Sequence, residues 1–176
     1  MNLGYKKKLL GVIALLGMFS AMEANAQSQN MNVSANVPNV CVIQNSGTAL
    51  QMAFGDIIDA NGNAQNLTQT ATISWKCTNN NAAEFLISPG SSTNAAARTM
   101  AGTTNDALTQ GAALAYTLTD PLNANWGDTT GNGYAVTGSG MSAWSTTIID
   151  GTITSAAALA APEGAYSDVV TITLNH

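Results

Sequence analysis

Near its start the chain reads Met31-Asn32-Val33-Ser34-Ala35-Asn36-Val37, so that apolar and polar side chains alternate with a period of two. This period is typical of a β-strand with one buried face, because successive side chains of a strand point to opposite sides. A second alternating stretch ends two residues before His176. Its apolar positions share one parity and are Tyr166, Val170, Ile172 and Leu174. The fold therefore depends on which sheet each of these two segments completes.

The residues before the first stretch have the pattern of an export signal. Three lysines at positions 6–8 precede a short apolar run, Leu9 to Phe19, and the small residues Ala24 and Ala26 stand at the usual cleavage positions. We predict a signal peptide over residues 1–26, which leaves a mature chain of 150 residues, the size of one domain. The apolar run is shorter than the ~20 residues that span a bilayer, so we expect no direct membrane insertion.

The predicted mature chain carries few charges. Its only cations are Lys76 and Arg98, against nine carboxylates once Glu23 has left with the signal, and its net charge is −7. Two cations cannot form a phosphate-binding surface. Nucleic acid and anionic lipid are therefore not expected as partners.

Cys41 and Cys77 are the only cysteines, and both follow the predicted cleavage site. In an oxidising compartment such a pair predicts a disulfide, with two unpaired buried thiols as the alternative. A metal site would need more ligands than two cysteines and the single histidine, His176, can supply. We therefore expect no metal.

The rest of the mature chain is a series of short alternating units separated by residues that favour turns. Many short strands with turn signals between them predict an all-β sandwich. The positions expected to face inward are Leu50, Met52 and Phe54; Ala71, Ile73, Trp75 and Cys77; Phe85 and Ile87; and Leu114, Tyr116 and Leu118.

Three connecting segments also carry local predictions. Asp150-Gly151 is a dipeptide suited to a tight hairpin turn. Asp59-Ala60-Asn61-Gly62-Asn63 predicts an ordinary Asn-Gly turn, because its glycine lies too early for a calcium-binding loop. The alanine-rich segment from Ser155 to Ala161 predicts a loop or one short turn.

Pro38 separates the first alternating stretch from Cys41. Proline fixes its own backbone and cannot donate a hydrogen bond to a ladder. We therefore interpret residues 27–38 as an N-terminal arm and residues 39–176 as the domain that follows it.

The sequence does not favour catalysis. His176 is the only histidine and the last residue, so a Ser-His-Asp triad would have to form at a fraying terminus. Carboxylate pairs such as Asp56 with Asp59 lie in turn-rich segments, where aspartate commonly bonds to the local backbone. We expect no enzyme, no catalytic residues and no cofactor.

Several motifs follow the export signal and the arm in a fixed order. They are Cys41, Met52-Ala53-Phe54-Gly55, Ile73-Ser74-Trp75-Lys76-Cys77, the strand from Leu114 to Leu118, and Gly164-Ala165-Tyr166-Ser167-Asp168 leading into Val170 to Leu174. In this order they resemble the spore coat protein U domain family, which includes subunits of archaic chaperone–usher pili. The resemblance covers essentially the whole mature chain.

The resemblance implies an incomplete immunoglobulin-like β-sandwich that lacks its final strand and is completed by donor-strand complementation. A periplasmic chaperone would lend a strand first, and the arm of the next subunit would then replace it. The implied donor residues are Met31, Val33, Ala35 and Val37. The implied strand that borders the acceptor groove and contacts the chaperone carries Tyr166, Val170, Ile172 and Leu174. Cys41 and Cys77 would form the disulfide of the family.

The implied function is that of a structural pilus subunit that supports adhesion and biofilm formation. Its partners would be a periplasmic chaperone, an outer-membrane usher and neighbouring subunits, and it would pass through the periplasm to a pilus on the cell surface. The alternative is a secreted, self-contained β-sandwich that binds glycans or a surface partner. Trp126 and Trp144 would then stack on a sugar ring, although inward packing of both is the stronger expectation.

Overall fold

A computed structural model describes residues 27–44, 46–103, 111–122 and 124–176. The signal peptide predicted for residues 1–26 lies outside the described residues. The chain divides into two units, of which the first ends at Ala35 and the second runs from Asn36 to His176.

The first alternating stretch forms no strand in this structure. Residues 27–39 have no regular secondary structure, and their side chains are exposed. Met31, Val33 and Val37 are 83%, 81% and 80% exposed. A strand needs a neighbouring strand to satisfy its backbone groups, so alternation alone does not produce one here.

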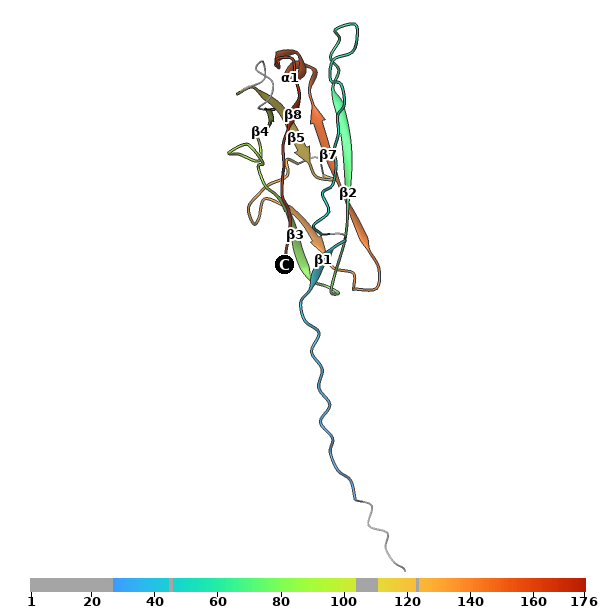
Figure 1. Cartoon of the computed structure of the whole chain (residues 1–176). Coiled ribbons are helices and arrows are strands. Elements are labelled where there is room, and N and C mark those ends of the chain that lie inside the picture. The colour runs from blue at the N-terminus through green and yellow to red at the C-terminus, as the bar shows by residue number, and fades with distance from the viewer. Residues whose placement is uncertain (1–26, 45, 104–110, 123) are drawn as a thin grey trace, which may run out of the picture. The chain divides into compact units, whose positions relative to one another are not determined.

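The second unit contains two antiparallel sheets, which confirms the all-β prediction (Figure 1). One sheet has six strands in the order β1-β2-β7-β5-β4-β8, and the other has three in the order β6-β3-β9. The elements are β1 (Cys41–Ile43), β2 (Leu67–Cys77), β3 (Ala82–Ile87), β4 (Arg98–Gly102), β5 (Ala113–Thr119), β6 (Tyr134–Thr137), β7 (Ser145–Ile153), α1 (Ser155–Ala160), β8 (Tyr166–Ser167) and β9 (Ile172–Asn175). Within the described residues, no helix is both long and apolar enough to cross a membrane.

The core forms between the two sheets from alternate residues of their strands. The inward positions predicted on β2, β3 and β5 are buried, apart from the half-buried Ala71. Trp75 of the larger sheet packs edge-on against Phe85 of the smaller one, with 5.8 Å between ring centroids. The predicted disulfide is confirmed, since Cys41 and Cys77 are bonded and join β1 to β2.

The hairpin turn predicted at Asp150-Gly151 is wrong. Both residues lie inside β7, where Asp150 pairs with Thr70 and Gly151 with Gln69 of β2. The glycine instead permits a close approach, because a Cβ atom at Gly151 would lie 2.2 Å from the Sδ atom of Met52. Glycine inside a strand commonly marks such an approach.

The strand predicted around Leu50, Met52 and Phe54 belongs to neither sheet. Residues 49–56 have no regular secondary structure, yet their burial still alternates, since Met52 and Phe54 are half-buried while Ala53 and Gly55 are exposed. The segment has the side-chain pattern of a strand but no neighbouring strand in the described chain.

The single strand predicted from Tyr166 to Leu174 is divided between the two sheets. β8 pairs with β4 in the larger sheet, and β9 pairs with β3 in the smaller one. The alternation nevertheless continues across the division, because the even-numbered residues from 166 to 174 are half-buried and the odd-numbered ones are exposed.

Two local predictions concern connecting segments. The turn at residues 59–63 is confirmed, since the Asp59 carboxylate accepts hydrogen bonds from the backbone N–H groups of Asn61 and Asn63, each at 2.8 Å. The segment predicted as a loop or one short turn is the six-residue helix α1. Thr154 caps it by accepting a hydrogen bond from the N–H of Ala157, and Ala158 is buried in the core.

Candidate functional site

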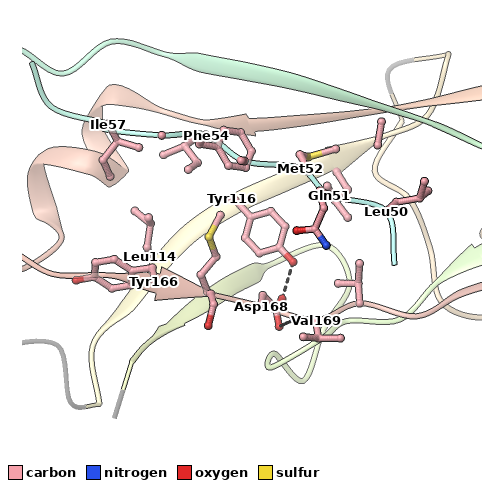
Figure 2. A pocket seen from close by; sticks show the side chains of 18 of the residues that line it. Leu50, Gln51, Met52, Phe54, Ile57, Leu114, Tyr116, Tyr166, Asp168 and Val169 are labelled. Carbon is pink, nitrogen blue, oxygen red and sulfur yellow. Dashed lines mark hydrogen bonds between the residues drawn. The ribbon is translucent and has the colours of Figure 1, made fainter. Parts of the chain in front are cut away.

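A groove of about 820 Å³ lies between two chain segments of the second unit (Figure 2). One wall consists of residues 49–57, which we call the N-terminal wall. The other consists of residues 164–172, which we call the C-terminal wall. The floor is the inner face of the larger sheet and is formed by Ala71, Met100, Leu114, Tyr116, Leu118, Ile149 and Ile153.

The C-terminal wall is hydrogen-bonded along one side. The Thr103 N–H donates to the Ala165 carbonyl and the Ser88 N–H to the Thr171 carbonyl, each at 2.9 Å. Successive residues of a strand direct their backbone groups to opposite sides. Ile172 and Leu174 of β9 therefore direct their N–H and C=O groups away from β3, at the outer edge of the three-stranded sheet.

Side-chain packing holds the N-terminal wall. Within the described part of the chain, the backbone of residues 49–57 makes no hydrogen bond to another segment. Met52 instead lies on the bare backbone of Gly151, and Phe54 lies beside it. The two walls of one groove are thus held in different ways.

A polar cluster ties the C-terminal wall to the floor. The Asp168 carboxylate accepts hydrogen bonds from the Tyr116 hydroxyl at 2.5 Å, from the N–H and the hydroxyl of Ser91 at 2.7 Å each, and from the Val169 N–H at 2.8 Å. A Cβ atom at Gly90 would lie 2.2 Å from the same carboxylate, so only glycine leaves room for it. Figure 2 shows the Tyr116 ring between the two walls with its hydroxyl directed at Asp168.

These contacts shift the pKa of both partners. Burial acts to raise the pKa of Asp168, but the hydrogen bonds from Tyr116, Ser91 and Val169 outweigh it and hold that pKa below its usual range. Burial, and then the neighbouring Asp168 carboxylate, raise the pKa of Tyr116. The pair is therefore an ionised carboxylate and a neutral phenol at neutral pH.

A buried arginine supports the loop that carries Ser91. Arg98 is 1% exposed, and its guanidinium donates to the carbonyls of Ala95, Ile87 and Trp126, the last two at 2.7 and 2.9 Å. Burial lowers the pKa of this guanidinium. Carbonyl oxygens satisfy the buried charge and connect the loop after β3 to the core.

The structure brings some of the predicted site residues together. Tyr166, Val170 and Ile172 line the groove, whereas Leu174 lies on β9 beyond the lining. The sequence reasoning overlooked Asp168, Tyr116 and Met52 as groove residues. Asp168 could have been found from its parity, because it stands at the even position between Tyr166 and Val170.

The tryptophans proposed for sugar stacking have different environments. Trp126 is buried, and its indole N–H donates to the Phe85 carbonyl at 2.9 Å, as inward packing predicts. Trp144 is 44% exposed, with the Lys76 ammonium 4.6 Å from its ring centroid. A stacking platform made of both rings is therefore absent. The described residues also contain no group of three or more metal-ligating side chains placed to hold a metal ion.

Comparison with known proteins gave a match to a family and likenesses among solved structures. The sequence pattern of the family described as Spore Coat Protein U domain matches residues 27–173. No curated protein matches the chain. Among solved structures, similarity was found to a chain of the CsuC–CsuE chaperone–tip adhesion subunit pre-assembly complex from archaic chaperone–usher Csu pili of Acinetobacter baumannii. That likeness has a TM-score of 0.49 and 18% identity, and it covers 80% of this chain but only 40% of the other.

Proposed function

The chain belongs to the Spore Coat Protein U domain family, and on this basis we propose that it is a structural subunit of a chaperone–usher pilus. In this proposal, each subunit inserts its N-terminal arm into the groove of its neighbour. The arm is residues 27–38, and residues 39–176 form the domain that receives an arm. The subunit is not an enzyme.

The groove between the two walls is the observation that carries the proposal. β9 is the edge strand of the three-stranded sheet, and the C-terminal wall leads directly into it. On the far side of the groove, the N-terminal wall has the side-chain alternation of a strand and, among the described residues, no strand hydrogen-bonded to it. One added strand would bond to the outer edge at Val170 and Ile172 and give the N-terminal wall a neighbour, as in other β-strand additions.

The arm has the right chemistry for this strand. Its apolar side chains, Met31, Val33, Ala35 and Val37, recur at every second residue, about 6.6–6.8 Å apart in an extended chain. Leu114, Tyr116 and Leu118 recur on the floor at the same interval. Full burial of each large donor side chain contributes roughly 1.5–3 kcal/mol, and Ala35 contributes less.

The partners follow from this mechanism. A periplasmic chaperone would occupy the groove before assembly, an outer-membrane usher would export the subunit, and neighbouring subunits would then supply the arm. The C-terminal wall, through Tyr166, Val170, Ile172 and Leu174, would border the strand lent by the chaperone and later the arm. The assembled pilus would lie on the cell surface and support adhesion and biofilm formation.

The oligomeric state of the purified mature chain, residues 27–176, tests the proposal. We expect polymers that resist denaturant, and we expect an excess of a synthetic peptide of residues 27–38 to cap and shorten them. A matched chain with Val33→Ser and Val37→Ser, here called the arm variant, should remain monomeric and gain stability when the unmodified peptide is added. A stable wild-type monomer that does not respond to the peptide would show that the sandwich is already complete.

A further inference from the structure

We infer that Asp168 is a positioning residue for the incoming strand, because it holds the two halves of the C-terminal wall in one line. The inference rests on the proposed function, since it concerns how the groove receives an arm. It goes further because it gives one polar residue, on an otherwise apolar face, a specific role. Asp168 determines how many residues of the C-terminal wall can pair with the arm.

Asp168 lies where the wall passes from one sheet to the other. β8 ends at Ser167 on β4, and β9 begins at Ile172 on β3. At this crossing Val169 pairs with no strand of the described part of the chain, and its N–H donates to the Asp168 carboxylate instead. The side chain of Asp168 thus accepts a backbone hydrogen bond that a neighbouring strand would otherwise accept.

The same carboxylate connects this crossing to two other parts of the domain. Tyr116 binds it from the floor of the groove, and Ser91 binds it from the loop that follows β3. The missing side chain at Gly90 provides the space. The crossing is therefore fixed to both sheets at once.

This attachment has a consequence for strand addition. On both sides of the crossing, the side chains that face the groove stand at even positions, from Tyr166 to Leu174. An incoming strand can follow the outer edge of the wall only while the two halves stay in line. If the crossing moves, the arm can pair with the half near β8 or with the half near β9, but not with both.

Tyr116→Phe is the direct test, because it keeps the ring on the floor and removes only the hydroxyl. The arm variant is refolded with an excess of fluorescently labelled peptide 27–38, and release of the label is followed after addition of unlabelled peptide. We expect the Tyr116→Phe form of this chain to release the peptide about tenfold faster, as for loss of one hydrogen bond to a charged group. Tyr134→Phe, on β6 outside the groove, is the matched control and should leave the rate unchanged.

A positional readout separates positioning from general loosening. Two further peptides carry Met31→Ser or Val37→Ser, one substitution at each end of the arm. Loss of alignment predicts that Tyr116→Phe accelerates release of one of these peptides and leaves the other almost unaffected, because one end of the arm is already detached in the variant. Equal acceleration for both, or no acceleration for the unmodified peptide, would overturn the inference.

Ser91→Ala provides a second variant if Tyr116→Phe folds poorly. It removes one donor to Asp168 without altering the floor, and the same positional pattern with a smaller acceleration is expected. A different result bears on the proposed function itself. If the chain with intact Tyr116 and Asp168 binds no labelled peptide, strand addition fails, and the inference fails with it.

Discussion

The two walls of the groove have similar side-chain patterns and different backbone environments. In both, alternate side chains point toward the core, as the half-buried Met52 and Phe54 do on one side and Val170 and Ile172 on the other. The C-terminal wall is bonded to β4 and β3 and is fixed by Asp168. The N-terminal wall has no backbone bond to another segment within the described residues and depends on contacts such as that of Met52 with Gly151.

This difference shows that alternation of apolar and polar side chains is compatible with a strand but does not by itself bring the segment into a sheet. Burial of one face can hold an extended segment against a core, whereas a ladder also requires a partner for its backbone groups. Among the described residues, the N-terminal wall has a buried face but no hydrogen-bond partner for its backbone in another segment. We therefore expect it to respond most strongly when a strand enters the groove.

The largest expected effect is on amide hydrogen exchange. In the arm variant without peptide, the amides of residues 49–57 should exchange orders of magnitude faster than those of Thr171 and Thr173, whose N–H groups face Ser88 and β3, because unbonded amides are not protected. Peptide 27–38 should slow exchange in the N-terminal wall and reduce this difference. Mass spectrometry measures this exchange. Protection of residues 49–57 in the absence of peptide would contradict the proposed difference between the two walls.

Loss of the disulfide should be the next largest effect. The bond closes a loop with a sequence separation of 36 residues, and its removal by Cys41→Ser with Cys77→Ser should cost roughly 3–4 kcal/mol of unfolding free energy. β1 precedes the N-terminal wall in the chain, so with peptide 27–38 bound, exchange should accelerate more in residues 49–57 than in the C-terminal wall. Denaturant titration gives the energy, and a uniform acceleration would count against this asymmetry.

The Asp168 cluster should make the C-terminal wall sensitive to acid. The pKa of folded Asp168 is held below its unfolded value of 3.8, so its contribution is fully present above that pH and is lost as the pH falls through the lower folded pKa. Tyr116→Phe should therefore reduce stability by about 1.5 kcal/mol at pH 7, and the difference from wild type should shrink below about pH 4. Urea titrations across this range measure it, and a pH-independent difference would contradict the assignment.

Gly151→Ala should have the smallest effect on overall stability and a selective effect on one wall. The added methyl group must displace the Met52 side chain, but that side chain is flexible, and alanine suits a strand better than glycine. The net change in unfolding free energy should stay below about 1 kcal/mol. With peptide 27–38 bound, exchange should rise in residues 49–57 and not at Thr173, and Thr146→Ala, at an exposed position of the same strand, is a suitable comparison.

Much of the fold was predictable from local patterns. The inward residues of β2, β3 and β5 follow the period of two, and the Cys41–Cys77 bond was predicted from two cysteines in a chain with the pattern of an export signal. The errors occurred where a local signal has two meanings. Asp-Gly is common in hairpin turns, but at Asp150-Gly151 the glycine makes room for Met52, which is almost 100 residues away in the sequence.

The amino-acid sequence was sufficient to predict which side of each segment faces the core, because that choice depends only on the parity of apolar residues. It also determined the all-β class and the family. The three-dimensional contacts were needed to see which segments have hydrogen-bonded neighbours and where the C-terminal segment changes sheets. They were also needed to see that Asp168 binds Tyr116 and Ser91. These features depend on contacts between residues distant in sequence, and no pattern within a short window contains them.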